Sequence, residues 1–260
     1  MFEGLLNDND AHRASATVHA VLAHGVPCAL TGGLAIAARL RAHGRLIERR
    51  DLNDIDLVVH GFDAIPESIA TAFLLHHVHA DAVEGKTLLQ LIDEATAVRV
   101  DLFRAFVNTL TRAAALDDET GGLLVVSVED LVARTTALVC GALQRRQAID
   151  PKHARAFTRL LGLGRQPELA AAWNDHRQAV PGTLEDATRE AIRLLHSHAE
   201  LVVAEKYSAA VLPCDRCRTH GLFQPGPADR AEQFEHRAVL DTVSARVGRG
   251  TAATPGPVRN

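Results

Sequence analysis

The stretch RRDLNDIDLVVHGF, residues 49–62, places Asp54 and Asp56 one residue apart at the start of an apolar, β-branched run. Side chains alternate along a strand, so residues two apart share a face and these two carboxylates lie close together. Like charges in such positions repel each other unless a cation is shared between them. A strand whose first residues share a cation is one interpretation of this stretch, and a solvated turn or a helix cap is the alternative.

The segments on either side of this strand favour an α/β (α+β) fold with a small mixed sheet. Apolar residues at helical spacing, glycines at helix ends and short β-branched runs alternate over the first hundred residues. The two runs that follow position 85 are separated by a short polar turn, which is typical of a hairpin. Helices are expected at 11–24, 34–44 and 63–77, and strands at 26–30, 55–59, 86–93 and 96–103.

The pattern becomes helical after a short β-like segment at 121–128. Ser127 is expected to cap one helix, and Asp150 followed by Pro151 is expected to start another. Further helices are predicted at 167–177 and 183–207. We expect a core over 1–126, an α-helical C-terminal domain over 127–247, and a Gly/Pro-rich disordered tail over 248–260.

A third carboxylate, Asp101 in VRVDLF, falls on one of the later predicted strands. Neighbouring strands lie about 5 Å apart, so this carboxylate can complete a cluster with the first two. Mg²⁺ prefers such hard oxygen ligands. The TGG turn that ends in Gly32 and Gly33 precedes a helix, and backbone amides at a helix start suit phosphate oxygens. A metal site and a phosphate site together indicate a nucleoside triphosphate.

On these residues the sequence resembles the DNA polymerase beta-like nucleotidyltransferase superfamily. TGGLAIAARL, NDIDLVV and VRVDLF match its Gly-Gly, Asp-x-Asp and third-Asp motifs in order, over about residues 26–103. Within the superfamily, the motif sequences most resemble those of small bacterial aminoglycoside nucleotidyltransferases and of abortive-infection toxin-type nucleotidyltransferases. In this chain Leu34 stands where many relatives carry Ser or Thr, so a phosphate contact would come from the backbone or from Thr31.

The resemblance implies a role for each matched residue. Asp54 and Asp56 would bind Mg²⁺, Asp101 would bind metal and help to deprotonate the acceptor, and Gly32 and Gly33 would cradle the triphosphate. Relatives carry a basic residue further downstream that reaches the nucleotide phosphates.

Several basic residues are candidates for a phosphate contact. Arg50 could steer phosphate or be a solvated loop arginine. Among the downstream residues Arg134, Arg145 and Lys152, we select Lys152 as the phosphate contact. The alternative is that all three lie on the solvent-exposed faces of helices.

A second candidate metal site lies in PCDRCRTHGLF. Cys214, Cys217 and His220 have the spacing of three zinc ligands, with His198 or His236 as a fourth. A redox dithiol and a plain loop with free thiols stay open as alternatives. The two other cysteines, Cys28 and Cys140, fall on apolar segments and are interpreted as small core residues.

Composition limits the partners. The formal net charge is −4, which argues against strong non-specific DNA binding. No stretch reaches the roughly 18 apolar residues of a membrane helix, and the N-terminal residues do not resemble a signal peptide, so we expect no membrane association and a cytoplasmic location.

The expected function is Mg²⁺-dependent transfer of NMP from an NTP, with ATP as the expected nucleotide, to a hydroxyl acceptor, with release of pyrophosphate. The acceptor could be a small molecule, a tRNA or a protein. The alternative is a catalytically inactive nucleotidyltransferase fold that acts as a binding module, either toxin–antitoxin-like or as a zinc-assisted contact to nucleic acid.

Overall fold

A computed structural model describes residues 2–61, 65–66, 68–76, 88–116, 122–204 and 222–223 of the chain. The chain divides into two compact units. Unit 1 comprises Met1–Ala11, Cys28–Asp51 and Ala105–Tyr207, and unit 2 comprises His12–Pro27, Leu52–Arg104 and Ser208–Asn260.

Unit 2 is built on a mixed set of strands. β2 (Ile55–Val59) runs parallel to β5 (Val98–Arg104), and β5 pairs antiparallel with β4 (Leu88–Asp93). β4 in turn pairs antiparallel with β3 (Phe73–His76), which pairs antiparallel with β8 (Leu222–Phe223). The hairpin predicted from the two apolar runs is confirmed as β4 and β5.

One face of these strands is apolar and packs against α1 (Asp8–Ala23), most of which belongs to unit 2. Val98, Val100 and Leu102 alternate along β5 on this face, and all are fully buried. Thr17 Oγ1 of α1 donates to Asp93 Oδ2 at 2.7 Å, at the end of β4. Because α1 covers this face, the polar side chains of the same strands gather on the other one.

The helix predicted over 63–77 is wrong in its second half. The described part of this segment contains the short helix α3 (Ile69–Ala72), and the chain then enters β3. Phe73 and Leu74 are registered with Asp93 and Ile92 of β4. A short apolar run is compatible with both a helix and a strand. Pairing with β4 makes these residues a strand.

Unit 1 combines three strands with most of the helices of the described part of the chain. β1 (Cys28–Leu30) runs parallel to β7 (Leu124–Val125), which pairs antiparallel with β6 (Ala114–Ala115). α2 (Gly32–Ala42) follows β1 directly. The helices downstream of β7 are α4 (Val128–Gln144), α5 (Pro151–Leu160), α6 (Glu168–His176) and α7 (Leu184–Ser197), followed by a 3₁₀ turn at Ala199–Leu201.

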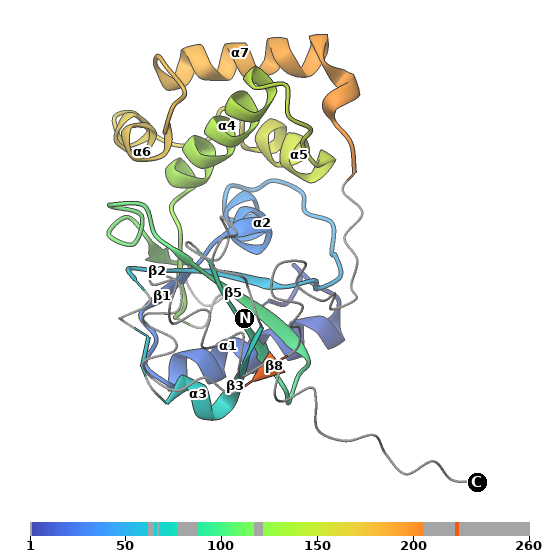
Figure 1. Cartoon of the computed structure of the whole chain (residues 1–260), viewed down its shortest axis with the longest axis vertical. Helices are drawn as coiled ribbons and strands as arrows, with labels where there is room; N and C mark the ends of the chain where they lie inside the picture. The colour runs from blue at the N-terminus through green and yellow to red at the C-terminus, as the bar shows by residue number, and fades with distance from the viewer. Residues whose placement is uncertain are drawn as a thin grey trace, which may run out of the picture. The chain divides into compact units, whose positions relative to one another are not determined.

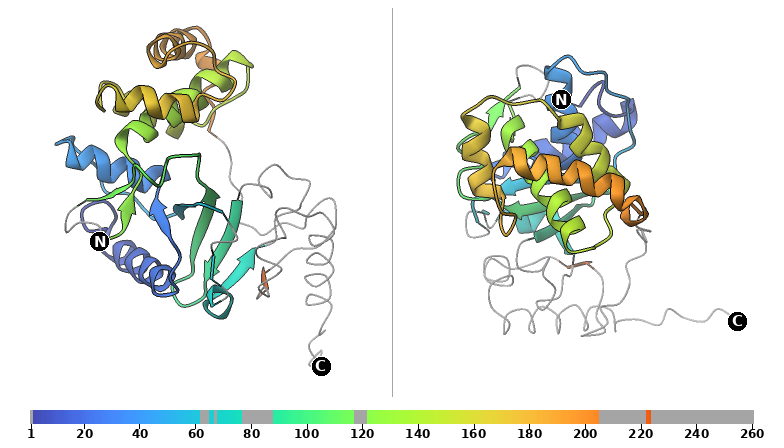
Figure 2. Two further views of the ribbon diagram at one scale, coloured as in Figure 1. Left: turned by 90° about the vertical axis from the view of Figure 1, so that its left-hand side faces the viewer. Right: turned by 90° about the horizontal axis from the view of Figure 1, so that it is seen from above.

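α4 is the central helix of this group, because it contacts α5, α6 and α7 (Figures 1 and 2). Their shared core includes Phe157, Trp173 and Cys140, all buried. Trp173 Nε1 donates to Gly182 O at 2.9 Å, so the largest side chain of this core keeps its polar atom satisfied. Cys28 and Cys140 are both buried, as expected.

The predicted helix starts are confirmed. Ser127 Oγ accepts from the Asp130 backbone N–H at 3.0 Å, and Asp150 Oδ1 accepts from the Lys152 backbone N–H at 2.7 Å. The last predicted helix, 183–207, is wrong in its length because α7 ends at Ser197. After the helix, the backbone of Ile149 donates to Leu201 O and accepts from the Val203 N–H, so the chain around Val202 pairs with Ile149 as an isolated β-bridge.

The mixed α/β content of the predicted fold class is confirmed. The predicted division into a core over 1–126 and a helical domain over 127–247 stays a prediction, and each compact unit includes residues from both sides of position 126. The predicted tail at 248–260 lies outside the described residues. Among the helices of the described part of the chain, none has the length and apolar character needed to cross a membrane.

Candidate functional site

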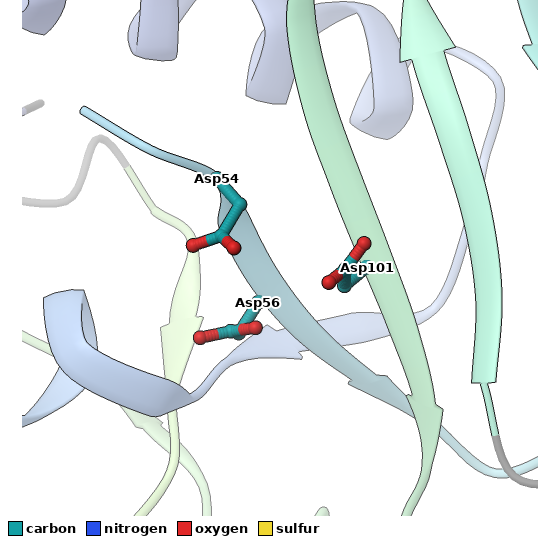
Figure 3. Close-up of side chains that lie close together, drawn as sticks. All are labelled: Asp54, Asp56 and Asp101. Atoms are coloured by element: carbon teal, nitrogen blue, oxygen red, sulfur yellow. The ribbon is translucent and has the colours of Figure 1, made fainter. Parts of the chain in front are cut away.

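Three aspartates converge on the polar face of unit 2. Asp54 and Asp56 share one side at the start of β2, and Asp56 is in register with Asp101 on the parallel neighbour β5 (Figure 3). One carboxylate oxygen from each residue lies within 4.8 Å of those from the other two. The structure therefore brings together the three carboxylates that the spacing singled out.

The cluster is partly buried and is held by neighbours on the same face. Asp101 is only 5% exposed, and Gln90 Nε2 of β4 donates to its Oδ1 at 3.2 Å. Arg99 precedes Asp101 by two residues and shares its face, so that its guanidinium pairs with Asp54 and lies 3.2 Å from Asp101. Arg99 and Gln90 were missed by the sequence analysis, although the Arg-x-Asp spacing places Arg99 beside the cluster.

The environment of Asp101 perturbs its ionisation. Burial raises the pKa of Asp101 from 3.8 to about 6, the charge of Arg99 opposes this rise, and the charge of Asp54 adds to it. A buried carboxylate beside other carboxylates costs stability when it ionises without a sufficient counter-charge.

This cost predicts a pH-dependent effect of Asp101→Asn on stability. The folded-state pKa lies above the unfolded one, so the penalty is absent below about pH 4 and is complete as pH rises above about 6. Relative to the wild type, Asp101→Asn is expected to be neutral at pH 4 and stabilising at pH 8 by up to about 3 kcal/mol. Urea unfolding in EDTA at both pH values measures this difference. A stability difference that is the same at both pH values would contradict the prediction.

The donor set of the cluster suits a hard divalent cation. Mg²⁺ takes carboxylate oxygens at about 2.1 Å in octahedral geometry, so two ligand oxygens on one ion lie up to about 4.2 Å apart. The observed separations need only a small side-chain adjustment to reach this geometry. A bound cation would also take over the counter-charge that Arg99 supplies to Asp54 and Asp101.

The glycine turn lies in unit 1, at the N-terminus of α2. Thr31 is the N-cap residue, and Gly32 has a φ of +65°, which a residue with a side chain rarely adopts. A Cβ atom on Gly33 would lie 2.5 Å from the Arg50 guanidinium, so Arg50 lies directly against the turn. Arg134 NH1 donates to Thr31 Oγ1 at 3.4 Å. Two guanidinium groups therefore lie at this helix N-terminus, an arrangement that suits an anion.

The remaining predicted site residues are the phosphate contact Lys152 and the candidate zinc ligands. Lys152 is exposed at the start of α5, and its role towards phosphate stays a prediction. Cys214, Cys217 and His220 lie outside the described residues, and so does His236. His198 is described, at the C-terminus of α7, where its Nδ1 lies 3.2 Å from Glu200.

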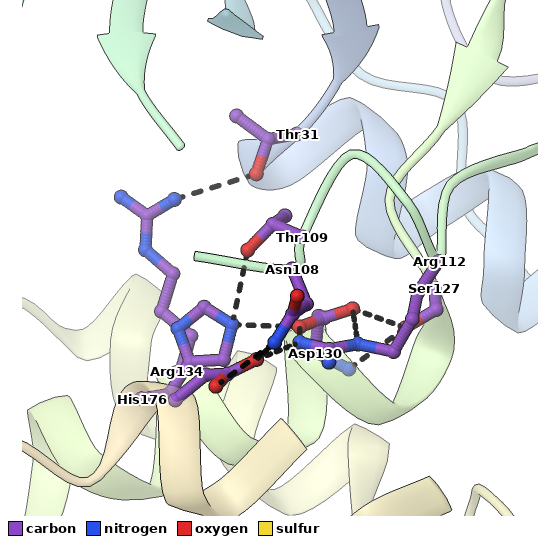
Figure 4. Close-up of polar contacts among 9 residues, drawn as sticks. Thr31, Asn108, Thr109, Arg112, Ser127, Asp130, Arg134 and His176 are labelled. Atoms are coloured by element: carbon purple, nitrogen blue, oxygen red, sulfur yellow. Dashed lines mark hydrogen bonds and ion pairs between the residues drawn. The ribbon is translucent and has the colours of Figure 1, made fainter. Parts of the chain in front are cut away.

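A buried polar network in unit 1 was not predicted. Asp130 is 1% exposed and accepts from Arg112 through both oxygens, at 2.9 and 2.5 Å, and from Ser127 at 2.6 Å (Figure 4). Its Oδ1 also lies 2.8 Å from His176 Nε2. Arg112 in addition donates to Asp175 at 2.7 Å. The sequence indicated only the Ser127 cap of this helix.

The network fixes the charge of its central residue. Burial raises the pKa of Asp130, but hydrogen bonds from Arg112, His176 and Ser127 outweigh this effect and lower it to about 2. The carboxylate hydrogen bonds in turn raise the pKa of Arg112. Asp130 is therefore a permanent anion at neutral pH, and a carboxylate can only accept the His176 Nε2–H.

The sequence matches no protein-family model, and no curated protein is similar to it. The interpretation of the site therefore depends on the geometry of the two groups of residues, the aspartate cluster of unit 2 and the glycine turn of unit 1.

Proposed function

We propose that the chain is a Mg²⁺-dependent nucleotidyltransferase that transfers NMP from an NTP, with ATP as the expected substrate, to a hydroxyl acceptor. The observation that carries the proposal is the convergence of Asp54, Asp56 and Asp101, with ligand atoms within 4.8 Å of one another on two paired strands. Arg99 brings one positive charge to this group of three carboxylates, and a divalent cation would offset their mutual repulsion further. The sequence motifs that resemble the DNA polymerase beta-like nucleotidyltransferases supply the reaction class.

The glycine turn of unit 1 supports the second half of the proposal, the binding of a polyphosphate. Backbone N–H groups at the start of α2 and the guanidinium groups of Arg50 and Arg134 offer donors and positive charge to phosphate oxygens. The close approach of Arg50 to Gly33 depends on the absence of a side chain at that position.

In the proposed reaction the acceptor oxygen forms a bond to the α-phosphorus of the NTP as the bond to the bridging oxygen breaks, and pyrophosphate leaves with that oxygen. When bound, Mg²⁺ would neutralise the charge that develops on the phosphate oxygens. In this proposal Asp101 takes the proton of the acceptor hydroxyl.

Isothermal titration of ATP, with and without Mg²⁺, tests the proposal. The wild type is expected to bind ATP at least about tenfold more tightly with Mg²⁺, because the cation joins the carboxylates to the phosphates. Combined Asp54→Ala and Asp56→Ala changes should remove the Mg²⁺ dependence. Glu94→Ala, an exposed carboxylate in the β4–β5 turn of the same unit, is the matched control and should retain it. Equal binding of ATP with and without Mg²⁺ by the wild type would refute the proposal.

One observation favours the alternative of a catalytically inactive binding module: Arg99 already forms ion pairs with Asp54 and Asp101. In that case the cluster is a structural ion-pair network and needs no metal. Binding of Mg²⁺–ATP followed by a screen of labelled NTPs against tRNA, small-molecule and protein acceptors separates the two functions and identifies the acceptor.

A further inference from the structure

A pocket of about 270 Å³ lies in unit 1, between α4 and the segment that follows α6. Its wall is apolar over Ala137, Leu138 and Val180, and Phe106 contributes an aromatic ring. The volume is below the roughly 300–1,000 Å³ of pockets that enclose a drug-sized ligand, so the pocket suits one planar ring system.

His176 also lines this pocket and carries a polar atom without a partner. The side chain is 3% exposed, its Nε2 faces Asp130, and its Nδ1 is buried with no hydrogen bond in the described part of the chain (Figure 4). Because Asp130 only accepts, Nε2 carries a proton, and Nδ1 presents a lone pair whenever the ring holds that proton alone. Buried polar atoms are nearly always hydrogen-bonded in native proteins, so this nitrogen indicates a missing donor.

Arg134 connects the pocket to the glycine turn. Its side chain lines the pocket, and its NH1 reaches Thr31 Oγ1 at 3.4 Å. A molecule with an anionic group at the turn can therefore extend a ring into the pocket along the same arginine. The ring of Phe106 meets that of His176 edge to face, with centroids 4.9 Å apart, and this contact holds the imidazole in place.

We propose that this pocket binds the base of the nucleotide and that His176 Nδ1 accepts a hydrogen bond from the exocyclic amine of adenine. His176 is then a specificity-determining residue, and Asp130 is the residue that positions its ring. The inference rests on the proposed function, because it takes the phosphates of the same nucleotide to lie at the Thr31–Gly33 turn.

Three probes separate the parts of this proposal: ATP, purine riboside 5′-triphosphate, which lacks the exocyclic amine, and inorganic tripolyphosphate. The wild type should bind ATP at least about tenfold more tightly than purine riboside triphosphate, the difference expected for one buried hydrogen bond. His176→Phe keeps an aromatic ring but has no acceptor atom, and Asp130 keeps its hydrogen bonds from Arg112 and Ser127, so this variant should bind both nucleotides equally. Tripolyphosphate should bind equally to both proteins.

A second pair of variants avoids the buried network. Ala179 is exposed and lines the pocket, whereas Ala171 is exposed on α6 and is not part of the pocket wall. Ala179→Trp should fill the pocket and weaken ATP at least about tenfold without changing tripolyphosphate binding. Ala171→Trp, the matched control, should change neither.

The outcomes distinguish the two proposals. The base-binding inference is wrong, while the proposed function stands, if the wild type binds tripolyphosphate but has the same affinity for ATP and purine riboside triphosphate. It is also wrong if Ala179→Trp leaves the affinity for ATP unchanged. If neither ATP nor tripolyphosphate binds the wild type, the proposed function itself fails.

Discussion

Asp56→Asn is expected to reduce nucleotidyl transfer by about a thousandfold or more, equivalent to about 4 kcal/mol of transition-state stabilisation. Asp56 lies directly opposite Asp101 in the register of β2 and β5, so its carboxylate borders any cation held by the cluster. The amide is nearly isosteric but lacks the negative charge that attracts a divalent ion. The strand itself should be retained, because the change conserves shape.

The rate of pyrophosphate release, measured with the acceptor identified by the screen, gives the size of this effect. Glu94→Gln changes an exposed carboxylate of unit 2 to its amide in the same way and should keep the wild-type rate. Urea unfolding of Asp56→Asn shows whether a loss of rate reflects a loss of fold. Transfer within about tenfold of the wild type by a folded Asp56→Asn protein would exclude the cluster as the catalytic centre.

The aspartate cluster could be predicted in large part from sequence because strands impose a two-residue period. That period places Asp54 beside Asp56 on one face, and the polar turn between the apolar runs indicated the hairpin that contains Asp101. The register could not be predicted. A slip of one residue between β2 and β5 would turn Asp101 to the opposite face and take Val100 and Leu102, both fully buried, out of the core.

The Asp130 network could not be predicted, because its members share no local pattern. Arg112 and His176 lie 18 and 46 residues from Asp130, and neither falls on a motif. The local signal was Asp130 itself, three residues after Ser127, which a helix cap explains fully. A first-turn aspartate is exposed in most helices, whereas Asp130 is 1% exposed, and this difference appears only once α6 packs against α4.

Asp130→Ala is expected to destabilise the protein by about 3–5 kcal/mol. The change removes the acceptor for two Arg112 hydrogen bonds and for His176 Nε2, and it leaves the His176 donor buried and the Arg112 donors partly buried. Arg112 keeps its ion pair with Asp175, but this single contact cannot compensate for a lost bidentate pair. Denaturant unfolding, followed through the single tryptophan Trp173 in the core beside α4, measures the loss.

Two companion variants separate the buried charge from the helix cap. Ser127→Ala removes the cap and one hydrogen bond to Asp130 but no charge, and it should cost only about 2 kcal/mol. The combined changes Arg112→Met and Asp130→Leu remove both charges and should cost less than Asp130→Ala alone, because no arginine is then left beside an apolar residue. If Asp130→Ala costs no more than Ser127→Ala, the ion-pair network contributes little, and the position of His176 would have to depend on its packing against Phe106 instead.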